Sequence, residues 1–175
     1  MDIRDILNNN NPHYTAQYGW QREFGDATFT FGYISSYKEA ADDLVDKLLP
    51  DLYIFPIMFC YRQYLELLLK NICQHHMKKK DYKDFVFDVS HDLSKIWPYA
   101  KSFLVNEIDE DKVNFIEQSI RFFHTLDPNS FTFRYEKDKK LNRSIKQDSL
   151  TINTLNLKKY IDTVDLYLRY TYDSL

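Results

Sequence analysis

Glycine and proline are scarce in this chain of 175 residues, which contains 3 glycines and 5 prolines. A β-sandwich or β-barrel reverses direction every few residues, and its turns draw mainly on glycine, proline, asparagine and aspartate. The shortage of both residues argues against an all-β fold and favours long helices. It therefore predicts an all-α protein.

Cysteine is scarcer still, since Cys60 and Cys73 are the only two. Both fall within one apolar segment of helical character, where thirteen positions correspond to about 20 Å along the helix axis. A disulfide needs Cα atoms within about 7 Å, so these two cannot pair with each other. We expect buried free thiols in a reducing compartment.

Long apolar runs and a leader segment are also lacking. The densest apolar stretch, residues 54–69, contains Arg62, Gln63 and Glu66, whereas a membrane-spanning helix needs about 20 mostly apolar residues. The N-terminus has no basic region followed by an apolar run, which a signal peptide requires. These features predict a soluble, cytoplasmic protein without a membrane partner.

Apolar and aromatic residues, in contrast, are abundant at 44% and 17% of the chain. This supply is enough to bury a core, and the length suits a single domain over residues 1–175. Residues 1–34 show no sustained periodicity. We expect them to form an irregular segment packed on the helical body, with a short extended piece at 28–31.

Helical periodicity begins at Ser36, which forms a capping box with Glu39, and Pro50 ends this first helix. Residues 53–77 are apolar around nearly the whole circumference, with Pro56 in the first turn, and this pattern predicts a central buried helix. Three more helices are predicted at about 90–104, 109–125 and 154–172. The predicted fold is an all-α bundle of four to five helices.

The stretch between 128 and 153 has a non-helical pattern. Residues 131–135, FTFRY, alternate like a strand, and 149–152 do so weakly, which predicts a small β-hairpin-like excursion. Its tip is basic, because residues 134–146 contain six basic and two acidic side chains, a net charge of +4. On a chain whose net charge is −3, such a cluster either contacts phosphate or forms a solvated loop.

One polar strip interrupts the apolar central helix. Arg62, Glu66 and Lys70 recur every four residues and therefore share one helix face. One interpretation is an ion-paired stripe where the helix meets solvent. The other is a binding strip that faces a cleft or a symmetry-related copy.

Residues 61–70, YRQYLELLLK, fit the pattern aromatic-Arg/His-x-x-Leu-Glu-x-x-Leu-Lys. This pattern is common in the second helix of the HEPN superfamily of helical bundles (higher eukaryotes and prokaryotes nucleotide-binding domain), which the segment resembles. Residues 90–93, SHDL, resemble the turn that opens the family's third helix, and 131–135 resemble more loosely a stretch near its fourth helix. The resemblance covers about 36–172 and implies a divergent prokaryotic member.

This resemblance implies a homodimer that acts on RNA. Many family members are metal-independent ribonucleases of toxin–antitoxin and antiviral defence systems, in which an Arg is followed four to six positions later by a His. The His moves protons and the Arg stabilises the phosphate charge during attack by the RNA's own 2′-hydroxyl. This sequence departs from the motif, because His124 follows Arg121 after only two residues. Whether the chain is an enzyme therefore stays open, and other branches of the family bind nucleotides or proteins without cleavage.

If RNA is cleaved, the catalytic groups must come from different segments, and the candidates are His91, Arg121 and His124. Each also has a structural interpretation: His91 caps a helix or donates to a carbonyl, Arg121 lies on the surface, and His124 is partly buried. The candidate binding residues are Arg62, Glu66, Lys70, Arg134, Tyr135, Lys139, Lys140 and Arg143. Arg134 has a structural alternative as well, an ion pair with Asp127 or Asp138.

No metal or cofactor is expected. The adjacent His75 and His76 point about 100° apart on a helix, and the sequence has no glycine-rich phosphate loop or dinucleotide fingerprint. Two hypotheses remain. The chain is a HEPN-like protein that acts on or binds RNA, with an antitoxin or other protein partner, or it is a non-catalytic dimeric module that binds a protein or a nucleotide. A purely structural helical protein is a third alternative.

Overall fold

The computed structural model describes residues 16, 23, 25–145 and 150–172. These residues contain six α-helices, and none of them lies in a β-strand. The prediction of an all-α protein is confirmed, with more helices than the four to five expected. The chain divides into two compact units, residues 1–33 and 34–175.

Helix α1, Asp26–Asp46, begins ten residues before the predicted start at Ser36. Gly25 precedes it with a φ of 99°, a conformation that glycine adopts readily. The predicted capping box is therefore wrong, as are the extended piece at 28–31 and the irregular assignment of 26–34. Alternating Thr and Phe carry a β-propensity that depends strongly on context, and here the continuing helix prevails. The packing predicted for residues 1–34 concerns a segment that mostly lies outside the described residues.

Helix α2, Pro50–His76, begins three residues earlier than predicted, and Pro56 lies inside it rather than in the first turn. A proline at this position removes the N–H that the Leu52 carbonyl would otherwise accept. The helix is buried on several faces, which confirms its prediction as the central element. Both cysteines are free, but only Cys73 is buried, and Cys60 is half-buried.

Helix α3, Lys79–Val89, occupies a segment for which the sequence predicted only a lysine-rich connection. Phe85 and Val89 provide its buried contacts, one turn apart on the same face. Helix α4, Leu93–Leu104, continues through Pro98 without a break.

Helices α5, Glu110–Leu126, and α6, Thr154–Tyr172, agree with their predicted ranges to within one residue. The segment between them does not contain the predicted strand at 131–135. There the N–H groups of Arg134 and Tyr135 both donate to the Phe131 carbonyl, which makes a turn. Within the described part of this segment, β-type pairing is limited to one antiparallel bridge between Lys137 and Arg143.

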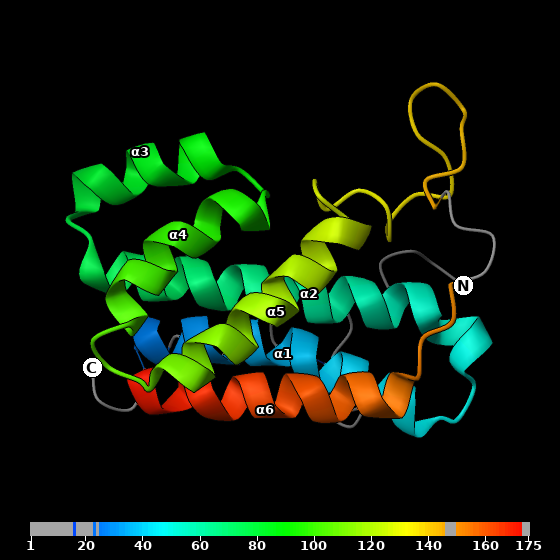
Figure 1. Ribbon diagram of the computed structural model, residues 1–175, viewed down its shortest axis with the longest axis horizontal. Helices are drawn as coiled ribbons and strands as arrows, with labels where there is room; N and C mark the ends of the chain where they lie inside the picture. Colours follow the sequence, from blue (N-terminus) through cyan, green and yellow to red (C-terminus); the bar gives the residue numbers. More distant parts are fainter. Residues whose placement is uncertain (1–15, 17–22, 24, 146–149, 173–175) are drawn as a thin grey trace. The chain divides into compact units, whose positions relative to one another are not determined.

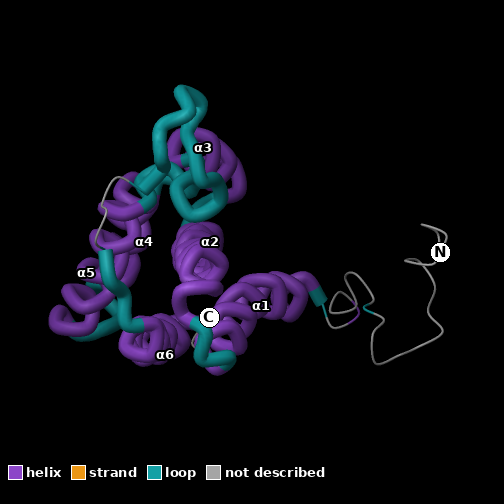
Figure 2. Tube along the Cα trace, turned by 90° about the vertical axis from the view of Figure 1, so that its right-hand side faces the viewer, coloured by secondary structure: helices purple, strands orange, loops and turns teal. Residues whose placement is uncertain are grey.

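In the larger unit, α2 packs against α3, α4 and α6, and α5 packs against α4 and α6. Figure 1 shows α6 running alongside α2, with α4 and α5 crossing in front. Figure 2 views α2 end on, with α3 above it and α4 and α5 to one side. The central position of α2 brings the ends of the surrounding helices to its polar strip.

Polar contacts add to the apolar packing around α6. Lys38 Nζ on α1 contacts Asp162 Oδ1 at 2.5 Å, and the Tyr64 hydroxyl on α2 donates to Asp165 Oδ1 at 2.5 Å. The apolar side chains of α6 that face the core are fully buried: Ile161, Val164 and Leu168. None of the helices in the described ranges is both long and apolar enough to cross a bilayer.

Candidate functional site

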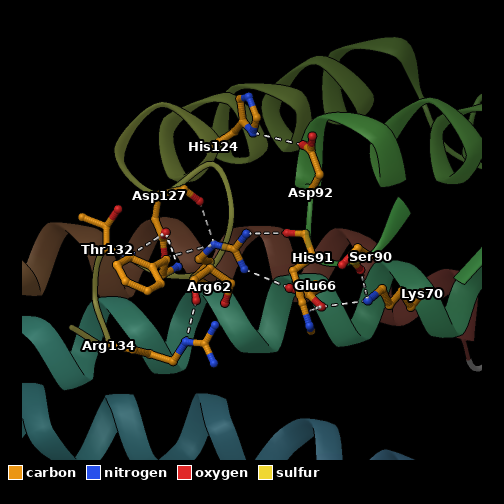
Figure 3. A network of polar contacts seen from close by, with 12 residues as sticks. Arg62, Glu66, Lys70, Ser90, His91, Asp92, His124, Asp127, Thr132 and Arg134 are labelled. Atoms are coloured by element: carbon orange, nitrogen blue, oxygen red, sulfur yellow. Dashed lines mark hydrogen bonds and ion pairs between the residues drawn. The ribbon is translucent and has the colours of Figure 1, made fainter. Parts of the chain in front are cut away.

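The polar strip of α2 forms the centre of a buried network (Figure 3). The side chain of Arg62 is 0% exposed and donates three hydrogen bonds. Nε donates to the Asp127 carbonyl at 3.0 Å, Nη1 to Glu66 Oε2 at 2.9 Å, and Nη2 to the His91 carbonyl at 2.6 Å. Arg62 therefore connects α2 to the turn before α4 and to the end of α5.

Glu66 lies next to Arg62, and its side chain is 1% exposed. Its Oε1 accepts a hydrogen bond from Lys70 Nζ at 2.8 Å and lies 2.8 Å from His91 Nδ1. Burial by itself raises the pKa of the Glu66 carboxyl, but hydrogen bonds from Lys70, His91 and Arg62 outweigh it and lower the pKa below its ordinary value. Glu66 is thus a buried carboxylate that its partners keep ionised.

The lowered pKa of Glu66 predicts a pH dependence of stability. A carboxyl that is more acidic in the folded state stabilises the fold above its unfolded pKa of about 4.3, and this contribution is lost as the pH falls through the folded value. Glu66→Gln removes the contribution, so the difference in unfolding free energy between wild type and variant should be largest near pH 7 and shrink below about pH 4. Urea denaturation at several pH values measures this difference, and a difference independent of pH would contradict it.

His91 connects the buried network to solvent. Its side chain is 56% exposed, although Nδ1 is held against Glu66 Oε1. A carboxylate at one ring nitrogen fixes the orientation of an imidazole and leaves the other nitrogen for a ligand or a proton. The predicted structural role, in which His91 caps a helix or donates to a carbonyl, is replaced by this contact with a carboxylate 25 residues earlier.

Asp92 caps α4. Its Oδ1 accepts from the backbone N–H and the hydroxyl of Ser94, at 2.9 and 2.7 Å. Burial raises the pKa of the Asp92 carboxyl, but the Ser94 hydrogen bonds and the nearby His124 lower it below its ordinary value. His124 Nδ1 on α5 lies 3.3 Å from the same Oδ1. In Figure 3 His124 lies on the α5 side of Asp92, whereas the His91 ring lies near Glu66 on α2.

Arg121, the third predicted catalytic residue, is not brought to either histidine. Its exposed guanidinium donates through Nε and Nη2 to Glu117 Oε1 on the preceding turn, at 3.0 and 2.5 Å. Lys101 Nζ on α4 also contacts Glu117, at 2.6 Å. Hydrogen bonds from Lys101 and Arg121 lower the pKa of Glu117 to about 2. Arg121 thus contributes to a surface ion-pair cluster.

The remaining predicted binding residues lie on a segment that we call the basic loop, residues 134–143. Asp127, fully buried at the end of α5, holds the residues that lead into this loop, because its Oδ1 accepts from the N–H groups of Phe131 and Thr132, at 2.6 and 2.8 Å. Arg134 Nε donates to the Ser130 carbonyl instead of pairing with a nearby aspartate. Lys146, at the end of the basic run, lies outside the described residues.

Further along the basic loop, Asp138 organises the chain reversal. Its Oδ1 accepts from the backbone N–H groups of Lys140 and Asn142, at 2.7 and 3.0 Å. Lys139, Lys140 and Arg143 are exposed, and their side chains take part in none of the ion pairs found in the described ranges. These three cations line a groove of about 770 Å³ that extends back to Asp127.

The structure therefore brings most of the predicted residues into two neighbouring groups. Arg62, Glu66, Lys70 and His91 belong to the buried network, and Lys139, Lys140 and Arg143 belong to the basic groove. The sequence did not predict the contact between Asp127 and Arg62, because the two residues are 65 positions apart. No three His, Cys, Asp or Glu side chains of the described residues are close enough together to hold a metal ion.

Comparisons with known proteins found no match: no protein-family model, no curated protein and no solved structure is similar to this chain.

Proposed function

We propose that this chain is a HEPN-like protein that acts on RNA and holds its phosphate backbone with the basic loop. Three exposed cations along the 770 Å³ groove, Lys139, Lys140 and Arg143, carry this proposal, since they form no ion pair with any residue that the structure describes. Lysine and arginine side chains contribute most to nucleic-acid affinity through phosphate contacts and the release of counterions. Membership of the HEPN superfamily, a homodimer and a role in prokaryotic defence or a toxin–antitoxin system belong to the same proposal, and they rest on the resemblance of residues 61–70 and 90–93.

Two acidic residues also line the groove, and each is engaged by other groups of the protein. Asp127 is engaged by backbone amides and lies 3.4 Å from Arg62 Nε, and Asp138 accepts from the amides of its own turn. Both carboxylates are therefore used by the protein itself. A polyanion that enters the groove meets the exposed side chains of Lys139, Lys140 and Arg143 along its lining.

In the catalytic form of the proposal, His91 and His124 transfer the protons. The 2′-oxygen of a ribose attacks the adjacent phosphorus while the bond from phosphorus to the 5′-oxygen breaks, which leaves a 2′,3′-cyclic phosphate and a 5′-hydroxyl. One imidazole accepts the 2′-hydroxyl proton and the other supplies a proton to the leaving oxygen. Glu66 and Asp92 act as positioning residues, because each lies against the Nδ1 atom of one histidine.

RNA cleavage in EDTA tests this form. Total RNA incubated with the wild type should be cut to fragments that end in cyclic phosphates, as identified by mass spectrometry. His91→Ala and His124→Ala should each reduce cleavage at least about 100-fold, the usual contribution of a general acid or base, with a nearly unchanged melting temperature. His75→Ala, an exposed histidine on α2, serves as the matched control and should cut like the wild type. Intact RNA with the wild type, or full activity in both variants, would contradict catalysis.

The non-catalytic alternative is favoured by the position of Arg121. Its guanidinium is paired with Glu117, whereas His91 contacts Glu66 and His124 lies near Asp92, so the arginine and histidine of the family motif are not joined. In this alternative the chain is a dimeric module that binds a protein partner or a nucleotide. Intact RNA in the cleavage experiment, together with RNA affinity that does not depend on the basic loop, is the outcome that selects it.

A further inference from the structure

Beside the basic groove lies a smaller pocket of about 360 Å³, within the range of about 300–1,000 Å³ that is usual for small-molecule sites. Phe55 from α2 and Tyr135 from the basic loop line it, together with Arg143, and the two aromatic side chains are 45% and 50% exposed. Large aromatic side chains usually bury most of their surface. Phe55 and Tyr135 come from segments 80 positions apart and meet at an open pocket. Their rings provide flat apolar faces suited to a planar ligand.

The Tyr135 ring is held in place from two directions. Phe131 lies against it with ring centroids 4.6 Å apart, and the Arg134 guanidinium carbon is 5.6 Å from the ring centroid. Arg134 is itself fixed by its hydrogen bond to the Ser130 carbonyl. A ring that is already positioned loses little conformational freedom when a base stacks on it.

The pocket and the basic groove adjoin each other, since Thr132, Arg143 and Ser144 line both. Their charges differ, however. The pocket contains the exposed carboxylate of Glu136, which repels phosphate and can accept from the amino group of a base. The groove adds Lys139 and Lys140 to Arg143, which lines both hollows. The arrangement therefore separates a place for an aromatic, uncharged group from a place for the phosphates attached to it.

We propose that the pocket between Phe55 and Tyr135 binds an unpaired nucleobase of single-stranded RNA, while Lys139, Lys140 and Arg143 bind the adjoining phosphates. The inference rests on the proposed function and names its substrate: a strand with exposed bases rather than a duplex. A base inside a duplex is stacked on its neighbours and cannot enter such a pocket, so stacking on aromatic side chains selects single strands.

Fluorescence anisotropy with a labelled 12-nucleotide RNA tests the inference. All riboses carry 2′-O-methyl groups, which prevent cleavage by the RNA's own 2′-hydroxyl and so separate binding from catalysis. The single strand should bind at least about tenfold more tightly than the duplex of the same sequence. Tyr135→Ala and Phe55→Ala should each weaken binding about 5- to 150-fold, the range that corresponds to loss of one stacked base. Tyr135→Phe should retain the wild-type affinity.

Two controls make the result specific. Phe87→Ala removes a phenylalanine on α3 that is 91% exposed and should leave binding unchanged. Lys139→Ala/Lys140→Ala should weaken the single strand and the duplex alike. Equal affinity for both forms, with no effect of Tyr135→Ala but a clear effect of the lysine variant, would overturn the stacking inference and leave RNA binding intact. If no variant loses affinity for the single strand or for the duplex, both the stacking inference and the proposed RNA binding by the basic loop are overturned.

The last part of the experiment is a competition with a free nucleotide, which offers the same base and one phosphate. Adenosine monophosphate should displace the labelled RNA only at concentrations far above the dissociation constant of the strand, because it lacks the additional phosphates. Displacement by the monophosphate at concentrations comparable to that constant would show that the pocket is built for a mononucleotide, and the single-stranded RNA assignment would fail.

Discussion

Replacing Arg62 by methionine is expected to lower the free energy of unfolding by about 3–5 kcal/mol, the usual cost of removing one partner of a buried ion pair. The Arg62 guanidinium satisfies the carbonyls of His91 and Asp127 as well as the Glu66 carboxylate. Methionine fills a similar volume but donates nothing. Because Lys70 and His91 still contact Glu66, the loss should lie in the lower half of this range. Urea denaturation followed by circular dichroism measures it.

Arg121→Met is the matched control for this experiment. Arg121 also forms an ion pair with a glutamate four residues away, but it is exposed, so its loss should cost about 0–1 kcal/mol. A double variant, Arg62→Met/Glu66→Leu, removes the buried charge together with its partner. It should recover part of the lost stability, since replacing a whole buried ion pair costs less than breaking it. Equal losses for Arg62→Met and Arg121→Met would show that the buried network contributes little.

Asp127→Ala is expected to lower the free energy of unfolding by about 2–4 kcal/mol. The buried carboxylate accepts from two backbone amides, and each donor left unsatisfied costs about 1–3 kcal/mol. The substitution should also weaken RNA binding without removing a single cation, because these two hydrogen bonds hold the start of the segment that carries the basic loop. Urea denaturation and fluorescence anisotropy on the same preparation measure both effects.

Two further variants separate the effects of Asp127 on stability and on binding. Asp127→Asn keeps a side-chain oxygen that can accept from the same amides. It should therefore lose less stability and less RNA affinity than Asp127→Ala. Asp109→Ala removes an exposed carboxylate at the other end of α5, where it pairs with Lys112, and should change neither appreciably. A destabilised Asp127→Ala variant with wild-type RNA affinity would show that the geometry of the loop does not matter for binding.

The sequence predicted the helices in which apolar residues repeat regularly. Helices α5 and α6 and the central position of α2 follow from this periodicity. Helix α3 was not predicted, because its lysines resembled a connection, although Phe85 and Val89 have the spacing of a buried face. The strand expected at 131–135 failed for a related reason, since alternating Phe and Thr over five residues is too short a signal to overcome the turn set by Asp127.

The candidate site was predictable only where its members are close together in the sequence. Arg62, Glu66 and Lys70 share a face by helical spacing, so their mutual contacts follow from α2 alone. The contacts of Arg62 with Asp127 and of Glu66 with His91 depend on how three helices pack, and no local pattern encodes them. The pocket formed by Phe55 and Tyr135 likewise depends on tertiary packing and could not be predicted from a local pattern.

Among the six helices, α6 is the last to be synthesised, and the nascent chain cannot complete its fold before α6 is available. Until it emerges, Lys38 lacks its contact with Asp162, and the apolar surface that will cover Ile161, Val164 and Leu168 stays open to water. Contacts that span 124 residues close late and slow the completion of a fold. A nascent chain in which α6 has not yet docked therefore carries an uncovered apolar face, which makes it prone to aggregation during that period.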